Sequence, residues 1–473
     1  MNHTLPKTKI AFAVTLAAYS YLFFQQSAGI NFLVFALLLM AAMAWEQPTL
    51  LRASLWRWLA LGSLVSATCL AWHGTALALT ATLISLVVLT GYSLQPSASF
   101  LVAGIQAIYS LVTALFQRTY RFLDEQSNLT RADQPKASNR LYTYALPVII
   151  TLVFFLLYWS ANANFATTLG QINLGFISWA WVWFTLGGFL LLFGVFYREF
   201  IPMLAYFDST SSDNLLKQER DYSINNLVLA LENNKGVVLL ALLNGLLLLV
   251  NLNDVVYFAF NKGIPVNSTF SEYVHQGVYT LIVTVLMAIG ILLYYFRDDQ
   301  HFYDKNRRLL NLAGAWVVQN GILLVITAYK NSWYVQEYGL TYKRIGVFVY
   351  LLLTLIGLVT TLFKLYQVKD IWFLIRKNSW AFYAVLVLST SLNWDRMIAS
   401  YNIHQARTID IGYILSLSDA ILPEIIKVKN NPDYPINDAQ KMWIDTRITQ
   451  LRQRVAHQSW QSWNYDEQLS INN

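Results

Sequence analysis

Residues 237–258 read VVLLALLNGLLLLVNLNDVVYF, and this stretch decides the fold. It contains a single charged residue, Asp254, and it exceeds the length of about 20 residues that an α-helix needs to cross a bilayer. A backbone surrounded by lipid must satisfy its hydrogen bonds within its own segment, as an α-helix does. The stretch therefore predicts a transmembrane helix. Its three amide side chains, Asn244, Asn251 and Asn253, are polar groups approaching Asp254 from within the bilayer.

The composition of the whole chain follows the same pattern. The 473 residues are 56% hydrophobic and 12% charged, whereas a soluble domain is about a quarter charged. The mean hydropathy is +0.42, and Trp and Tyr stand at the ends of many apolar runs, as expected for side chains at headgroup depth. The surplus apolar surface must face lipid. The expected fold class is an all-α polytopic integral membrane helix bundle.

Apolar runs of about 17 residues or more predict eleven transmembrane helices. They lie near residues 9–25, 29–45, 55–72, 75–92, 142–160, 177–197, 237–258, 277–296, 312–329, 345–365 and 379–396. The loops between them then alternate between two sides of the membrane.

The basic residues are distributed unevenly between these two sides. Nineteen fall on one side: Lys7, Lys9, Arg52, Arg118, Arg121, Arg131, Lys136, Arg140, Arg198, Lys217, Arg220, Lys235, Arg297, Lys305, Arg307, Arg308, Lys369, Arg376 and Lys377. Only Lys262, Lys330, Lys343 and Arg344 fall on the other. Basic loops stay in the cytoplasm, so the N-terminus is predicted inside and the C-terminus periplasmic or extracellular. The net charge of +7 thus indicates membrane orientation and no nucleic-acid partner.

Four regions follow from these boundaries. Residues 1–98 form a four-helix membrane region, 99–140 an interfacial amphipathic helix and cytoplasmic loop, 141–396 a seven-helix membrane domain, and 397–473 a small α-helical extracytoplasmic domain.

The segment 99–117 is nearly long enough to span the membrane. It carries a polar stripe that includes Gln106, Ser110 and Gln117, which predicts a helix lying in the interface.

The soluble regions contain signals for further helices. In the C-terminal domain, Asn437 can cap a helix whose apolar residues include Ile444 and Leu451 at helical spacing. Ser418 and Asp419 can begin another, with a proline in its first turns. The cytoplasmic segment 198–236 is predicted to hold a short helix over 215–233. The C-terminal domain is expected to dock on the outer face of the membrane domain, since about 75 residues are marginal for independent stability.

Several short motifs in the second half resemble a bacterial membrane-protein family known only as a domain of unknown function (types 4153 and 4173). They are Ser271-Glu272-Tyr273-Val274, Glu337-Tyr338-Gly339-Leu340-Thr341 with Arg344, Asp395-Arg396 with Ile398-Ala399 and Tyr401-Asn402, Tyr413-Ile414-Leu415-Ser416-Leu417-Ser418-Asp419-Ala420, and Trp460 with Ser462-Trp463-Asn464. The resemblance covers roughly residues 140–470, and the first four helices match less clearly. It implies a multi-pass bacterial membrane protein and supplies no activity.

Charged side chains gather at the predicted outer face of this same stretch. The candidate outer-face polar cluster consists of Asp254, Glu272, His275, Glu337, Arg344, Asp395 and Arg396. The candidate intramembrane polar residues are Asn244, Asn251, Asn253, Gln319 and Asn320. Polar groups at that depth cost free energy unless they pair with one another or line a water-filled cavity.

Two interpretations of these residues stay open. In the functional one, the outer cluster is a polar pocket that binds a small ligand, an ion or a partner segment. In the structural one, the charges form ion pairs that clamp the outer loops and seat the C-terminal domain. Gln319 and Asn320 are likewise candidates for hydrogen bonds to the helix over 237–258.

An enzyme is not expected. The sequence lacks a P-loop, the H-E-x-x-H and G-x-S-x-G motifs and any paired Cys/His set, so no catalytic residue, cofactor or metal site is predicted. Two function classes remain for a bacterial inner-membrane protein. One is a sensing, scaffolding or regulatory component with a protein partner at 397–473 or 198–236, and the other is a permease or channel-like transporter using the second-half helices. The peripheral position of the carboxylates favours the first class.

Overall fold

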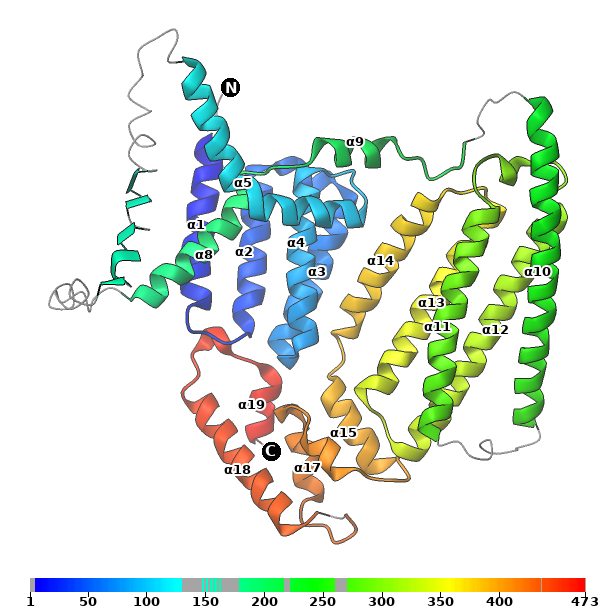
Figure 1. Ribbon diagram of the computed structural model, residues 1–473. Helices are drawn as coiled ribbons and strands as arrows, with labels where there is room; N and C mark the ends of the chain where they lie inside the picture. Colours follow the sequence, from blue (N-terminus) through cyan, green and yellow to red (C-terminus); the bar gives the residue numbers. More distant parts are fainter. Residues whose placement is uncertain are drawn as a thin grey trace.

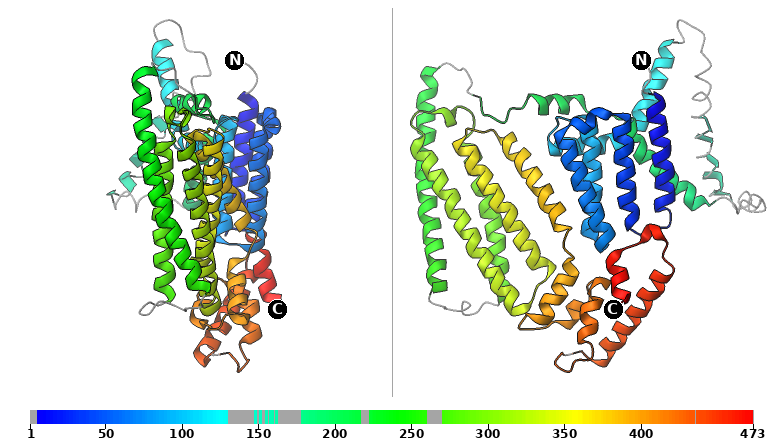
Figure 2. Two further views of the ribbon diagram at one scale, coloured as in Figure 1. Left: turned by 90° about the vertical axis from the view of Figure 1, so that its right-hand side faces the viewer. Right: turned by 180° about the vertical axis from the view of Figure 1, so that it is seen from behind.

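The computed structural model describes residues 5–129, 178–216, 222–259, 270–434 and 436–472, together with short pieces between 147 and 162. Throughout these ranges the regular secondary structure is helical. The long helices run side by side along one axis, and residues 390–472, here called the tail, gather at one end of them (Figures 1 and 2). We call that end the tail face, and the end where α1 begins the opposite face.

The N-terminal unit contains the first helices of the chain. These are α1 (Leu5–Phe23), α2 (Ile30–Glu46), the 3₁₀ helix η1 (Pro48–Arg52), α3 (Ser54–His73), α4 (Ala76–Leu94), α5 (Phe100–Leu129) and α8 (Trp179–Phe196). Its buried core draws residues from α1 to α5 and α8. The α3–α4 turn is short because Gly74 adopts a left-handed conformation (φ 63°) and the Thr75 hydroxyl accepts a hydrogen bond from the Ala78 amide.

The second unit contains four long helices with a separate core. They are α10 (Tyr222–Ala259), α11 (Phe270–Tyr295), α12 (Arg307–Tyr338) and α13 (Tyr342–Tyr366). Between the units lie α9 (Pro202–Thr210) and α14 (Ile371–Ser389), and η3 (Asp298–Phe302) links α11 to α12. α14 packs on α13 and also contributes Tyr383 and Val387 to the core of the N-terminal unit, where the Tyr383 hydroxyl donates to Ser85.

The tail is a chain of short helices that share a core with the second unit. It comprises α15 (Trp394–His404), α16 (Ile411–Leu415), η4 (Asp419–Ile421), α17 (Leu422–Val428), α18 (Asp438–Ala456), η5 (Trp460–Ser462) and α19 (Tyr465–Asn472). Its buried side chains form one cluster with Val335, Leu340 and Ile345, from the tail-face ends of α12 and α13 and the link between them. The tail is thus docked on the bundle.

The sequence signals for helices in the tail are confirmed. Asn437 caps α18 in a capping box with Gln440, and Ile444 and Leu451 of this helix are buried. The Ser418–Asp419 signal begins η4, which leads into α17 with its proline in the first turn.

Ten of the eleven predicted spans coincide with helices, and the eleventh, 142–160, lies largely outside the described residues. By length and apolar composition, seven described helices can cross a membrane: Ala76–Leu94, Phe100–Arg121, Trp179–Phe196, Leu227–Val256, Arg307–Tyr338, Tyr342–Tyr366 and Ile371–Ser389. The chain is therefore a multi-helix membrane-type protein, and the count of eleven spans stays a prediction.

The segment predicted to lie in the interface belongs to α5, which crosses the ends of its neighbours (Figure 1). Gln106 exchanges two hydrogen bonds with the backbone of Ile201, and Ser110 bonds to Gly194 and Glu199. These partners lie near the opposite face, just where α8 ends. The length of Phe100–Arg121 would allow a span, but its contacts gather at one end of the bundle.

Two predicted boundaries are wrong. The last span was placed over 379–396, but α14 ends at Ser389, and Asp395 and Arg396 begin the separate helix α15. The Asn393 side chain caps that new helix by accepting from the Arg396 amide. Of the short helix predicted over 215–233, residues 217–221 lie outside the described residues, and 222–233 are the first part of α10, which continues without a break to Ala259.

Candidate functional site

The predicted intramembrane amides join α10 to α12. The Asn244 side chain donates to the Leu312 carbonyl (3.0 Å) and accepts from the Gln319 side chain (2.7 Å). One heptad further along, Asn251 donates to the Gln319 carbonyl (3.1 Å). The residue numbers rise together on both helices, so α10 and α12 are parallel neighbours. These bonds are the interhelical hydrogen bonds that the structural interpretation anticipated.

The other two amides of this set behave differently. Asn253 is exposed on α10 and faces away from α12. Asn320 is buried and donates to the Trp316 carbonyl of its own helix (2.8 Å), and it also lines a cavity.

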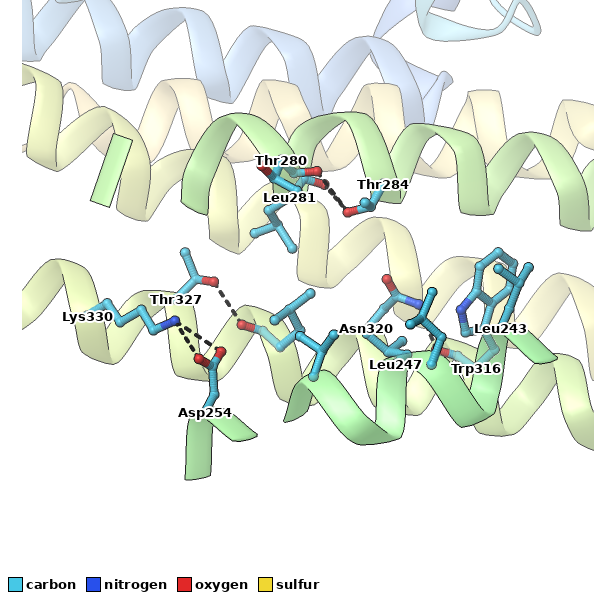
Figure 3. A pocket seen from close by; sticks show the side chains of 13 residues that line it. Leu243, Leu247, Asp254, Thr280, Leu281, Thr284, Trp316, Asn320, Thr327 and Lys330 are labelled. Carbon is cyan, nitrogen blue, oxygen red and sulfur yellow. Dashed lines mark hydrogen bonds and ion pairs between the residues drawn. The ribbon is translucent and has the colours of Figure 1, made fainter. Parts of the chain in front are cut away.

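That cavity lies between α10 and α11, which both pack on α12 and barely touch each other (Figure 3). We call it the lateral groove. Its volume is about 460 Å³, and its lining residues are Leu243, Leu246, Leu247, Val250, Asp254, Thr280, Leu281, Thr284, Trp316, Asn320, Leu323, Thr327 and Lys330. Most of these side chains are apolar. Leu246 is 61% exposed, so the groove opens sideways, toward the surroundings of the bundle.

An ion pair stands at the tail-face end of the groove. The Lys330 ammonium donates to both carboxylate oxygens of Asp254, at 2.9 and 3.0 Å, and both side chains are largely buried. Sequence reasoning found Asp254 but placed Lys330 in an outer loop. Lys330 lies instead within α12, eight residues before its end, where it faces α10.

Four other members of the outer-face cluster, Glu337, Arg344, Asp395 and Arg396, each bond to partners close by. Glu337 pairs with Arg407 and Arg396 with Glu424, both within the tail junction. Asp395 accepts from the Tyr342 hydroxyl at 2.7 Å.

Arg344 lies over the Tyr334 ring, 4.0 Å from its centroid, and donates to the Tyr338 carbonyl. Glu272 and His275 lie in the first turns of α11, but their side chains are outside the described part. The cluster therefore shares one face without forming one pocket among the side chains described.

A second cavity of about 460 Å³ lies where the tail meets both units, and we call it the junction pocket. Its acidic, basic and histidine lining residues are His73, Asp395, Asp419, Arg447, Arg454, Asp466 and Glu467. Arg447 binds Asp419 and the carbonyls of Leu415 and Leu417, which ties α18 to the segment around η4. Among the cluster members whose side chains are described, Asp395 alone lines this pocket.

The centre of the junction is a three-residue contact among distant parts of the chain. The Asp466 carboxylate of α19 accepts hydrogen bonds from His73 Nδ1 (2.8 Å) and from the side-chain amide of Asn393 (2.6 Å). His73 ends α3, and Asn393 directly precedes α15. His73 Nε2 lies 3.2 Å from the Ser391 carbonyl. Because both partners of the ring are acceptors, both ring nitrogens can donate only in the protonated imidazolium.

The electrostatics of the junction favour an ionised Asp466. Burial works to raise the pKa of this carboxyl, but the hydrogen bonds from His73 and Asn393 outweigh it, so the pKa lies below its ordinary value. Burial raises the pKa of the neighbouring Glu467. Within the described ranges, no group of three His, Cys, Asp or Glu side chains is arranged to hold a metal ion.

A backbone contact completes the junction beside this centre. The Ile30 amide donates to the Trp463 carbonyl at 3.0 Å, and the Ser27 amide donates to the Ser462 hydroxyl. Asn464 donates to the Leu70 carbonyl of α3. The tail thus bonds to the α1–α2 loop and the α3–α4 hairpin at one end, and to the second unit at the other.

The profile of a family described as a domain of unknown function (DUF4153) matches residues 11–428. The chain belongs to this family. The DUF4153 match includes the first four helices, which the quoted motifs left less clear, and it ends before α18, so the motif around Trp463 lies beyond it. No curated protein and no solved structure shows significant similarity to the chain.

Proposed function

We propose that this DUF4153 protein is a non-enzymatic sensing, scaffolding or regulatory component of the bacterial inner membrane. In this proposal the tail, on the extracytoplasmic side, couples the two membrane units. The observation that carries it is the contact of Asp466 with His73, which fixes the tail to the N-terminal unit, while the tail shares its core with Val335 and Ile345 of the second unit.

The distribution of basic residues supports this orientation. The start of α1, the α2–α3 link and α9 all lie at the opposite face (Figure 1). Arg198, Arg297 and Arg376 stand at this face and pair with acidic partners. Retention of cationic loops in the cytoplasm would place the tail outside.

Exposed aromatic and apolar side chains mark where a protein partner would bind. In the tail, Trp460 is 53% and Met442 70% exposed, and in α9 Met203 is 81% exposed. Exposed apolar side chains of this size are typical of interaction surfaces when they gather in patches.

The coupling can be tested by measuring the distance between the units. Spin labels at Tyr21 of α1 and Leu242 of α10, both exposed, would report it in a Cys69→Ser background. Asp466→Asn should broaden the distance distribution, while the control Asp438→Asn, whose carboxylate is fully exposed, should not. Identical distributions in all three proteins would refute the coupling. A tag after Asn473 that is protected from an impermeant probe in intact cells would refute the orientation.

The alternative is a permease or channel-like transporter, and the lateral groove that reaches Asn320 is the observation in its favour. The groove runs between Trp316 and Lys330 along α12, about 20 Å at 1.5 Å per residue. Toward the opposite face, Leu240, Leu309 and Ala313 are fully buried and fill the space. If the chain is a permease, cysteines introduced at positions 320 and 313 should react with impermeant reagents applied from opposite sides of the membrane. If it is a sensing, scaffolding or regulatory component, the cysteine at position 313 should stay unreactive.

A further inference from the structure

The lateral groove has a polarity gradient along its length. Its middle is lined by leucine and valine side chains of α10 together with Leu281 and Leu323. Its tail-face end holds the charged pair of Asp254 and Lys330, and Thr327 stands beside them (Figure 3). An apolar slot that ends in charged groups is complementary to an amphiphile with one polar end.

The charged end lies at the depth of a lipid headgroup. Lys330 is eight residues before the end of α12, which places it about 12 Å from that end. α12 has 32 residues and is about 48 Å long, against a hydrocarbon core of about 30 Å. The pair therefore falls near the boundary between the acyl chains and the headgroups, and the leucine-lined part falls within the hydrocarbon.

The volume of the groove, about 460 Å³, is that of a small-molecule site. Small-molecule sites have volumes of about 300–1,000 Å³.

We propose that the lateral groove binds one phospholipid with a zwitterionic headgroup of the phosphoethanolamine type. Its acyl chain lies along Leu246, Leu247 and Val250. Its phosphate contacts Lys330, and its ammonium contacts Asp254. A headgroup with both charges complements a pair with both charges, whereas the anionic phosphoglycerol headgroup would meet the Asp254 carboxylate without a cation of its own. This inference goes beyond the proposed coupling and depends on neither the tail nor the orientation.

The chain offers a matched pair of positions for testing the groove. Leu246 and Leu249 are both on α10, are 61% and 66% exposed, and differ in that only Leu246 lines the groove. The protein would be reconstituted in vesicles of equal phosphatidylethanolamine and phosphatidylglycerol, re-extracted in mild detergent, and its retained lipids counted by native mass spectrometry. We expect about one retained phosphatidylethanolamine per chain in the wild type and in Leu249→Trp, and a loss of about tenfold in Leu246→Trp.

Charge variants test the headgroup separately. Asp254→Asn removes the acidic partner and leaves the lysine, so the retained lipid should shift toward phosphatidylglycerol by about tenfold. Thermal unfolding of each variant would be measured alongside to show that it folds. If Asp254→Asn fails to fold, Lys330→Gln takes its place. We expect Lys330→Gln to lose the retained phosphatidylethanolamine. Equal retention in the two tryptophan variants would overturn the site. An unchanged headgroup preference in Asp254→Asn and Lys330→Gln would overturn the role of the ion pair.

Discussion

Helices α3 and α4 of the N-terminal unit and helices α10 and α12 of the second unit satisfy polar side chains inside an apolar bundle in different ways. In the N-terminal unit, buried hydroxyls such as those of Ser63, Thr82 and Ser85 donate to carbonyls one turn earlier on their own helix. In the second unit, the longer amides of Asn244 and Gln319 bond across from α10 to α12. A hydroxyl that bonds to a carbonyl of its own helix leaves the helix surface smooth enough for close packing. An amide that bonds across to another helix holds the two helices together without filling the space beside them.

Helices α4 and α10 differ strongly in how much of each is buried. In α4, 61% of the apolar window is buried, against 22% in α10. Small residues let helices of the N-terminal unit approach closely, as is usual for membrane bundles. The second unit leaves α10 mostly exposed and the lateral groove open beside it. The groove thus lies beside the less buried of these two helices.

The largest expected effect separates the N-terminal unit from the tail. A Cβ atom at Gly29 would lie 2.6 Å from the Ser462 carbonyl group and the Trp463 oxygen, so Gly29→Val would push the tail off the α1–α2 loop. We expect a loss of roughly 3 kcal/mol in the free energy of unfolding. The loss would be measured by thermal unfolding in detergent, together with protease sensitivity of the tail.

A glycine of the second unit provides the control for this change. A Cβ at Gly245 of α10 would meet nothing within 4 Å, so Gly245→Val should leave both readouts close to wild type. Equal destabilisation by the two substitutions would contradict the close approach of the tail.

The next effect concerns the centre of the junction. Asp466→Asn removes a charge from the contact with His73 and Asn393, and we expect a loss of about 2 kcal/mol at neutral pH. The folded pKa of Asp466 is lowered, so its stabilisation is present above the ordinary pKa of 3.8 and disappears as the pH falls through the folded value. Wild type and variant should therefore converge in acid. A constant difference in melting temperature from neutral pH down to strongly acidic pH would argue against this origin.

A smaller effect tests the bridging amides of the second unit. Asn244→Leu removes the bonds to Leu312 and Gln319, and bonds of this kind contribute about 0.6–1.7 kcal/mol in membrane proteins. Asn253→Leu, on the exposed side of the same helix, should cost little or nothing. A double-mutant cycle with Gln319→Leu isolates the pairwise coupling. Additive effects of the two substitutions would show that the bridge contributes nothing.

Much of the fold was predictable from the sequence, because long apolar runs have one stable arrangement in lipid. The capping signal at Asn437 and the interhelical role of Gln319 also followed from local pattern and spacing. The contacts of the tail junction could not be predicted in this way. His73 and Asp466 are 393 residues apart, and nothing in the neighbourhood of a single histidine at a hairpin indicates its partner.

The lateral groove was only partly predictable. The deep amides were identified as polar groups needing partners, but the groove depends on which helices pack together. α10 packs on α12 and leaves α11 aside, an arrangement that the order of the spans does not specify. For the same reason Lys330 was expected in a loop, although α12 carries it far enough inward to meet Asp254.

The smallest expected effect is a pH dependence at the opposite face of the second unit. Burial, followed by the nearby charge of Lys364, lowers the pKa of His301 in η3 to about 4 from its ordinary 6.5. The unfolded chain therefore binds a proton between these values while the folded chain does not, so stability falls as the pH falls below 6.5. Between pH 7 and pH 6 the loss should be under about 1 kcal/mol.

Replacing the histidine tests this directly. His301→Phe keeps a ring beside Phe296, whose centroid lies 5.3 Å away, and should flatten the dependence of melting temperature on pH in this range. His457→Phe, at an exposed position after α18, should retain the wild-type slope. An unchanged slope in His301→Phe would assign the acid sensitivity to another group. A flattened slope would show that the second unit, besides its open groove, holds a histidine that must stay neutral for the helices α11 to α13 to remain packed.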